Sequence, residues 1–107
     1  MDDLLTFEHP AFGLISGVAV THFKKEPYFF AEQVACALGF LNPQKEVFKR
    51  CTDKKIYSGY RNLSPVIPVD DVTRLINQSP SVEAERFRRW FLSEVLPQAN
   101  KMGALSI

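Results

Sequence analysis

The segment 30–51 constrains the fold most, because it carries two helix patterns separated by a helix-terminating glycine. In FAEQVACALGF the apolar residues fall at the spacing of a helix with one buried face; they are Ala31, Val34, Ala35 and Leu38. Gly39 stands where a glycine commonly follows the last helical turn. Asn42 is then a candidate N-cap, and Pro43 suits the first position of a second helix. The segment therefore predicts a helix, a short glycine turn and a second helix.

The first third of the chain has a pattern typical of strands. LLTFEH alternates roughly, and GVAVTHF and YFF add β-branched and aromatic residues, with KKEP as a polar turn. Residues 4–30 therefore predict a small antiparallel sheet. Residues 52–69 are less regular. We interpret TDKK as a turn, IYSGYRNLS as a loop or short ribbon, and PVIPV as a short strand whose prolines suit a sheet edge.

Two further helices are predicted in the C-terminal part. DVTRLINQ opens or is capped at Asp70, with inward residues Val72, Leu75 and Ile76. The last helix begins at a Ser81 cap, runs to Leu96 and stops at Pro97. Together these elements predict an α+β fold, in which a small N-terminal antiparallel sheet packs with about four short helices, including a helix-turn-helix-like pair. We expect residues 1–107 to form a single domain, with no second domain.

The stretch ERFRRWF places three arginines among three aromatic residues, and this pattern fits either a nucleic-acid surface or a core helix. A helical projection gives a buried face made of Ala84, Phe87, Phe91, Leu92 and Val95. Arg86 and Arg89 fall on the opposite side and are additional candidates for phosphate contacts. Arg88 falls inside the apolar arc, where a charged side chain needs a partner or a path to water. We predict a structural ion pair of Arg88 with Asp70 or Asp71.

Composition argues against several classes of protein. Apolar residues make up 46% of the chain and charged residues 23%, which is typical of a soluble globular domain. No apolar run approaches the roughly 18 residues of a membrane span, and the N-terminus lacks a signal-peptide pattern. We expect Cys36 to be buried and Cys51 to be partly exposed, both reduced in the cytoplasm.

Chemistry-bearing motifs are few. Neither His9 nor His22 has metal-ligand spacing, and the chain has no nucleophile elbow, phosphate-binding glycine loop or paired carboxylates with a partner base. We therefore expect no metal, no cofactor and no enzymatic activity.

Net charge is only +1, but the charge is unevenly distributed. Residues 1–23 carry three acidic groups and no Lys or Arg, whereas residues 24–61 carry eight Lys or Arg against four Asp or Glu. Residues 62–107 are balanced. A basic middle segment in a near-neutral protein permits binding to phosphates without requiring it.

Three blocks in order give the chain a family resemblance. They are PYFFAEQVACALGFLNPQKEV at 27–47, VIPVDDVTRLINQS at 66–79 and EAERFRRWFLSEVLPQANKMG at 83–103. This arrangement resembles the BRO N-terminal domain of baculovirus repeated-ORF proteins and phage antirepressors. The resemblance implies a DNA-binding domain of a phage regulator that acts in the cytoplasm of a bacterial host. Family members usually carry a second domain, whose function we expect to be absent here or supplied by another protein, and many have a longer polar loop where this chain has KKIYSGYRNLSP.

Basic residues of the second helix and the following loop are the predicted site. We expect this helix to bury Val47 and Phe48 and to present its polar side to DNA. Candidates for base contact are Asn42, Gln44 and Lys45; candidates for phosphate contact are Lys49, Arg50, Lys54, Lys55 and Arg61. Tyr57 and Tyr60 could stack or hydrogen-bond there.

The predicted partner is double-stranded DNA, with homodimerisation through PVIPV or the GALSI tail as a route to higher affinity. The alternative is an antirepressor that captures a repressor protein and makes no direct DNA contact. The near-neutral charge, acidic N-terminus and apolar tail of the chain fit that alternative as well.

Overall fold

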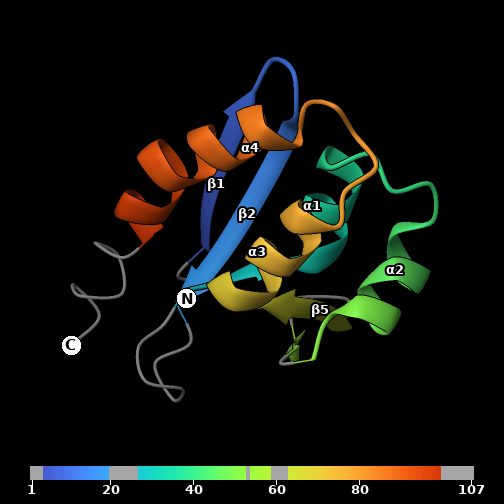
Figure 1. Ribbon diagram of the computed structural model, residues 1–107. Coiled ribbons are helices and arrows are strands. Elements are labelled where there is room, and N and C mark those ends of the chain that lie inside the picture. The colour runs from blue at the N-terminus through green and yellow to red at the C-terminus, as the bar shows by residue number, and fades with distance from the viewer. Residues whose placement is uncertain (1–3, 20–26, 53, 59–62, 100–107) are drawn as a thin grey trace.

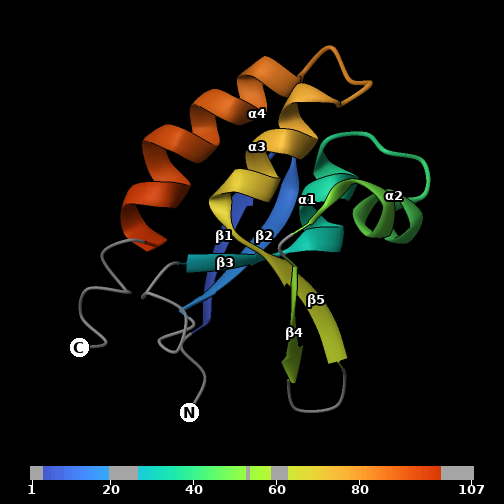
Figure 2. The same ribbon diagram turned by 60° about the horizontal axis from the view of Figure 1, so that its bottom comes forward.

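Helices cover one face of an antiparallel sheet, and a β-hairpin extends from the sheet away from them (Figure 1, Figure 2). The computed structural model describes residues 4–19, 27–52, 54–58 and 63–99. The strands are β1 (Leu4–His9), β2 (Gly13–Ala19), β3 (Pro27–Phe30), β4 (Lys55–Ser58) and β5 (Leu63–Ile67). The helices are α1 (Ala31–Ala37), α2 (Pro43–Arg50), α3 (Val69–Asn77) and α4 (Ala84–Trp90), followed by a π-helical segment η1 (Phe91–Val95). The predicted α+β class, with its sheet and helical pair, is confirmed.

The sheet has the strand order β1-β2-β3-β5-β4, and every neighbouring pair is antiparallel. The predicted sheet of residues 4–30 is confirmed as β1 to β3, and β4 and β5 extend it. The prediction that PVIPV forms an edge was wrong, because β5 lies between β3 and β4. Pro65 is tolerated there because β3 pairs with β5 only at Val66 and Ile67, so Pro65 lacks a strand neighbour on the β3 side.

The core lies between the sheet and the helices. Ile15, Phe29 and Ile67 project from the sheet into this layer and are fully buried. Phe87 and Phe91 reach it from the C-terminal helix, and the rings of Phe29 and Phe91 meet edge-to-face with centroids 4.9 Å apart. Aromatic burial on this scale dominates the energetics of a small domain.

Helix α1 is fixed at both ends. The side chain of Gln33 accepts a hydrogen bond from the Ser16 amide on β2 and donates to the Ser16 hydroxyl over 3.3 Å, which attaches α1 to the sheet. At the C-terminus Gly39 has φ +83° and donates to the Cys36 carbonyl, while Phe40 donates to the Ala35 carbonyl. This pair of bonds is the glycine-dependent motif that ends helices, as predicted for Gly39.

Helix α3 begins at Val69, one residue before Asp70, which was predicted to open or cap the helix. Pro68 is the residue that precedes its first turn, and Asp70 is an exposed member of that turn rather than its cap. Acidic residues in a first turn face the positive end of the helix dipole. The inward residues Val72, Leu75 and Ile76 are buried, as predicted.

The last helix continues past Pro97 to residue 99, so the predicted stop at this proline was wrong. In η1 the amide of Leu96 donates to the Phe91 carbonyl, five residues back. This wider turn accommodates a proline, which in an α-helix would clash with the carbonyl four residues earlier. The extra residue per turn also changes the facing of the side chains. Leu92, predicted to be buried, is half-exposed, whereas Trp90 is buried.

The start of the last helix also differs in detail. Ser81 precedes it by three residues, and its hydroxyl accepts a hydrogen bond from the Glu83 amide over 3.0 Å. Glu83 is the residue before the first helical position, and its side chain makes no capping bond. Ser81 therefore organises the turn that leads into α4.

The predicted ion pair of Arg88 with Asp70 or Asp71 was wrong. Arg88 lies 3.3 Å from Glu85 of its own helix and donates to the side-chain oxygen of Asn77. Asp71 is paired instead with Arg74 at 2.8 Å. The reason is position along α3, because Arg88 meets the C-terminal end of that helix and the two aspartates lie in its first turn.

Both cysteine predictions were wrong. Cys36 is exposed, because α1 turns Ala31, Val34 and Ala35 toward the core and leaves this position outside. Cys51 follows the last residue of α2 and is buried. Burial, and secondarily the charge of Asp71, raise the pKa of the Cys51 thiol to about 11. Within the described ranges, no helix is long and apolar enough to cross a bilayer.

Candidate nucleic-acid interface

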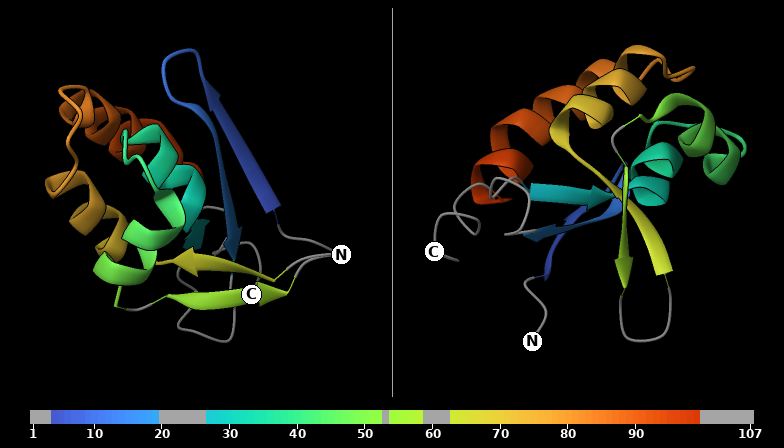
Figure 3. Two further views of the ribbon diagram at one scale, coloured as in Figure 1. Left: turned by 90° about the vertical axis from the view of Figure 1, so that its right-hand side faces the viewer. Right: turned by 90° about the horizontal axis from the view of Figure 1, so that it is seen from below.

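Helix α2 lies at the periphery and packs on α1 and α3 (Figure 1, Figure 3). Val47 is its one buried residue. Its exposed residues are Gln44, Lys45, Phe48 and Lys49. At about 100° per residue these four positions form one continuous arc. The helix therefore presents a surface with two lysines, one amide, one aromatic ring and no carboxylate.

Phe48 was predicted to face the core, and this was wrong. Its side chain is 78% exposed. A helix of eight residues that touches the body along one line has room for about one inward residue per turn, and Val47 occupies that position. Leu41, just before the helix, is also fully exposed.

Arg50 is engaged within the protein. Its guanidinium forms an ion pair with Glu46 one turn earlier and a hydrogen bond to the side chain of Gln78 after α3. It also lies over the ring of Phe40, 5.4 Å from the centroid. The hydrogen bond from Arg50, followed by its charge and those of nearby lysines, lowers the pKa of the Glu46 carboxyl. The one acidic residue of α2 is thus neutralised by Arg50, although it lies next to Lys49 at the border of the exposed arc.

Asn42 acts as the predicted N-cap of α2. Its side-chain oxygen accepts from the Lys45 amide over 3.4 Å, and Pro43 occupies the first helical position. This hydrogen bond gives the Asn42 side chain a local structural role.

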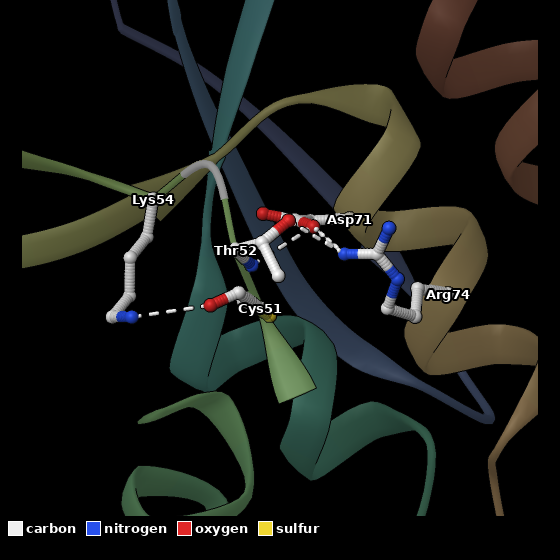
Figure 4. Close-up of polar contacts among 5 residues, drawn as sticks. All are labelled: Cys51, Thr52, Lys54, Asp71 and Arg74. Carbon is white, nitrogen blue, oxygen red and sulfur yellow. Dashed lines mark hydrogen bonds and ion pairs between the residues drawn. The ribbon is translucent and has the colours of Figure 1, made fainter. Parts of the chain in front are cut away.

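The chain leaving α2 is held by a polar network (Figure 4). Asp71, which is fully buried, accepts from the Thr52 amide over 3.3 Å and from Arg74 over 2.8 Å. Arg74 also donates to the Thr52 hydroxyl over 2.8 Å. The ammonium of Lys54 donates to the Cys51 carbonyl over 3.1 Å. Thr52 is therefore held against α3 just after the end of α2, and the Lys54 side chain is folded back toward the helix.

The remaining predicted site residues lie in different parts of the molecule, and some of them fall outside the description. Lys55 and Tyr57 belong to β4, with side chains outside the description, while Tyr60 and Arg61 lie outside the described residues. Arg86 and Arg89 are exposed on α4, and α3 stands between α4 and α2 (Figure 2). Arg86 is paired with Glu83 at 3.5 Å. These two arginines are therefore on a separate surface from the α2 lysines.

The comparisons with known proteins give one match. A family model described as the BRO family, N-terminal domain, matches residues 18–97. This range takes in β3, all the helices and the β4–β5 hairpin. Searches of curated proteins and of solved structures gave no match.

Proposed function

The chain belongs to the BRO family through its N-terminal domain, and from this we propose that it is a regulatory DNA-binding module of the phage or prophage type, which presents α2 to double-stranded DNA. One observation carries the proposal. The exposed residues of α2 include Lys45 and Lys49, whereas its single carboxylate, Glu46, is bound by Arg50. A peripheral helix with an uncompensated basic face is what the major groove admits.

The exposed positions and the contacts assign these residues to two kinds of DNA contact. Lys49 lies at the edge of the exposed arc, in the last turn of α2, and is assigned to phosphate, together with Lys54 beyond the helix end. Gln44 and Lys45 stand in the first turn, where recognition helices approach base edges. Gln pairs well with adenine and Lys with guanine in the major groove. Arg50 is left out of this surface, because Glu46 and Gln78 already bind its guanidinium.

We propose that the domain acts by binding and without catalysis, and that relief of repression is its regulatory role. Binding of this kind depends on phosphate charge, and a monomer with only a few lysine contacts has modest affinity. Homodimerisation is the natural way to increase it. Pairing of two β4 edges is a route that the sheet order supports, because β4 is terminal in the sheet. Sedimentation at high concentration tests this, and a monomer throughout removes the dimer from the proposal.

A matched pair of double variants tests DNA binding. Lys45→Ala/Lys49→Ala and Arg86→Ala/Arg89→Ala remove the same charge from two separate exposed surfaces. In a mobility-shift assay with mixed-sequence duplex at low salt, we expect the lysine variant to lose the shift and the arginine variant to retain most of it. Equal losses in both variants would show that only net charge matters and would contradict the assignment to α2.

Capture of a repressor protein is a second candidate, favoured by two exposed apolar residues. Leu41 is fully exposed and Val82 almost fully exposed. Their loops meet, because the Ser79 hydroxyl donates to the Leu38 carbonyl over 2.6 Å. Leu41→Ser/Val82→Ser should abolish repressor binding and leave the DNA shift intact if this surface serves a protein partner. The lysine variant should have the opposite profile.

A further inference from the structure

We propose that Phe48 reads thymine, by packing its ring against the C5-methyl group in the major groove, and that it thereby gives α2 a preference for particular A·T positions. This inference rests on the proposed function of α2 and goes further, because it names a specificity-determining residue and the chemical group that it recognises.

The position of Phe48 is the first argument. A large apolar side chain at 78% exposure has no role in the core, which α2 reaches through Val47 alone. Phe48 lies on the same arc as the lysine pair, one helical turn after Gln44. On the helical projection the ring lies between Gln44 and Lys45, so a helix that places these two residues at the base edges places the ring there as well.

Lys54 fixes the ring in this setting. Its ammonium lies 5.1 Å from the centroid of the Phe48 ring and donates to the Cys51 carbonyl over 3.1 Å. The cation therefore lies over one face of the ring and makes a cation–π contact with it. A cation at this point also favours an approaching phosphate. An acidic protein surface could bind the same cations. A contact between the Phe48 ring and a duplex, by contrast, is specific and can be tested chemically.

The chemistry of the groove selects the ligand. Among the four bases, thymine alone presents a methyl group in the major groove, and phenylalanine is one of the side chains that contact it. Removing one contacted methyl group from water corresponds to a change in affinity of about fourfold. Replacing thymine by deoxyuridine deletes that methyl group and keeps the hydrogen-bonding edge of the base.

The experiment pairs variants of the protein with variants of the DNA. A duplex of about 20 base pairs, sufficient for one or two helix contacts, is enriched from a random pool by the full chain. It is then synthesised with thymine or with deoxyuridine at every thymine position. Dissociation constants for both forms are measured by fluorescence anisotropy for the unchanged chain, Phe48→Ala and Leu41→Ala. Leu41→Ala is the matched control, because it removes another exposed apolar side chain just before the same helix.

We expect the unchanged chain and Leu41→Ala to bind the thymine duplex about fourfold more tightly per contacted methyl than the deoxyuridine duplex. Phe48→Ala should bind both forms equally. The same thymine preference in Phe48→Ala would overturn the inference, and so would failure to enrich any sequence despite a shift. A preference for single-stranded over duplex DNA would overturn it too, if Phe48→Ala removes that preference and deoxyuridine leaves it unchanged. The ring would then be a stacking surface for bases. Absence of any duplex binding by the unchanged chain would instead overturn the proposed function on which the inference rests.

Discussion

Arg88 of α4 donates a hydrogen bond to the side-chain oxygen of Asn77, the last residue of α3. The next residue, Gln78, accepts from Arg50 of α2. Two arginines from opposite sides thus meet the C-terminal end of α3, where the helix dipole favours positive charge. Both serve the fold, and this leaves Lys45 and Lys49 as the exposed cations of α2.

The bond between Arg88 and Asn77 predicts the effect of removing the guanidinium. Arg88→Ala should lower the free energy of unfolding by about 1 kcal/mol, a value reduced because Arg88 is partly exposed. The neighbouring exposed residue provides the control, and Arg89→Ala should stay within about 0.5 kcal/mol of the unchanged chain. Urea unfolding measures both. Equal stabilities of the two variants would contradict a structural role for Arg88.

Asp70 and Asp71 are adjacent in the first turn of α3 and predict opposite outcomes. Asp71 is fully buried and holds both Arg74 and the Thr52 amide, whereas Asp70 is exposed. Asp71→Ala should destabilise the protein by about 2–4 kcal/mol, because it leaves buried donors without their acceptor. Asp70→Ala should change stability by less than about 0.5 kcal/mol. Thermal unfolding with circular dichroism separates them, and a small effect at Asp71 would mean that the network in Figure 4 adds little.

The turn between α1 and α2 depends on Gly39. Its φ of +83° is unfavourable for any side chain, and an added Cβ would lie 3.2 Å from the Cβ of Ser81. Gly13 has a similar φ of +78° with nothing within 4 Å of an added Cβ. Gly13→Ala should therefore cost about 1–2 kcal/mol from the backbone alone. Gly39→Ala should cost more, and guanidinium unfolding of the pair isolates the contact with Ser81. Equal costs would show that the two loops adjust freely.

The two cysteines should react at very different rates. A thiol with a pKa of about 11 is ionised in about one molecule in a thousand at pH 8, and Cys51 is also buried. A disulfide reagent should therefore modify one thiol quickly in the native protein, and Cys36→Ser should abolish this fast phase. Two fast equivalents would contradict the burial of Cys51.

The raised pKa also has a consequence for stability. The unfolded thiol ionises near its ordinary value of 9.0, whereas the folded thiol ionises near 11. The unfolded state therefore binds fewer protons between these values, and the contribution of Cys51 to the free energy of unfolding falls as pH rises from about 9 to about 11. Unfolding curves of the unchanged chain and Cys51→Ala across this range should converge as the pH increases.

Local signals predicted much of the architecture. Gly39, Asn42 and Pro43 define the helical pair because each satisfies a backbone requirement that depends on its immediate neighbours alone. Period-two patterns likewise located β1 to β3. The position of β5 inside the sheet could not be obtained this way, since it depends on pairing with β3 across an intervening helical pair.

Side-chain facing was the less predictable part of the site. The local sequence pattern predicts Phe48 as a core residue. Its side chain is exposed because little of α2 packs against the rest of the protein. The sequence predicts Arg50 as a phosphate ligand. In the structure its guanidinium instead donates to Gln78, which lies 28 residues away along the chain. The projection of the last helix failed at Leu92 because the π-helical segment changes the angle per residue. Tertiary contacts decided each of these cases.

The salt dependence of DNA binding tests the central claim most directly. Each phosphate contact contributes a slope of about 0.9 to the plot of log affinity against log salt concentration. For Lys45→Ala/Lys49→Ala the slope should be smaller in magnitude by about 1 than for the unchanged chain, because Lys49 is the member of this pair assigned to phosphate, and for Arg86→Ala/Arg89→Ala it should be unchanged. An unaltered slope in the lysine variant, or the larger decrease in the arginine variant, would contradict the assignment of the phosphate-binding surface to α2.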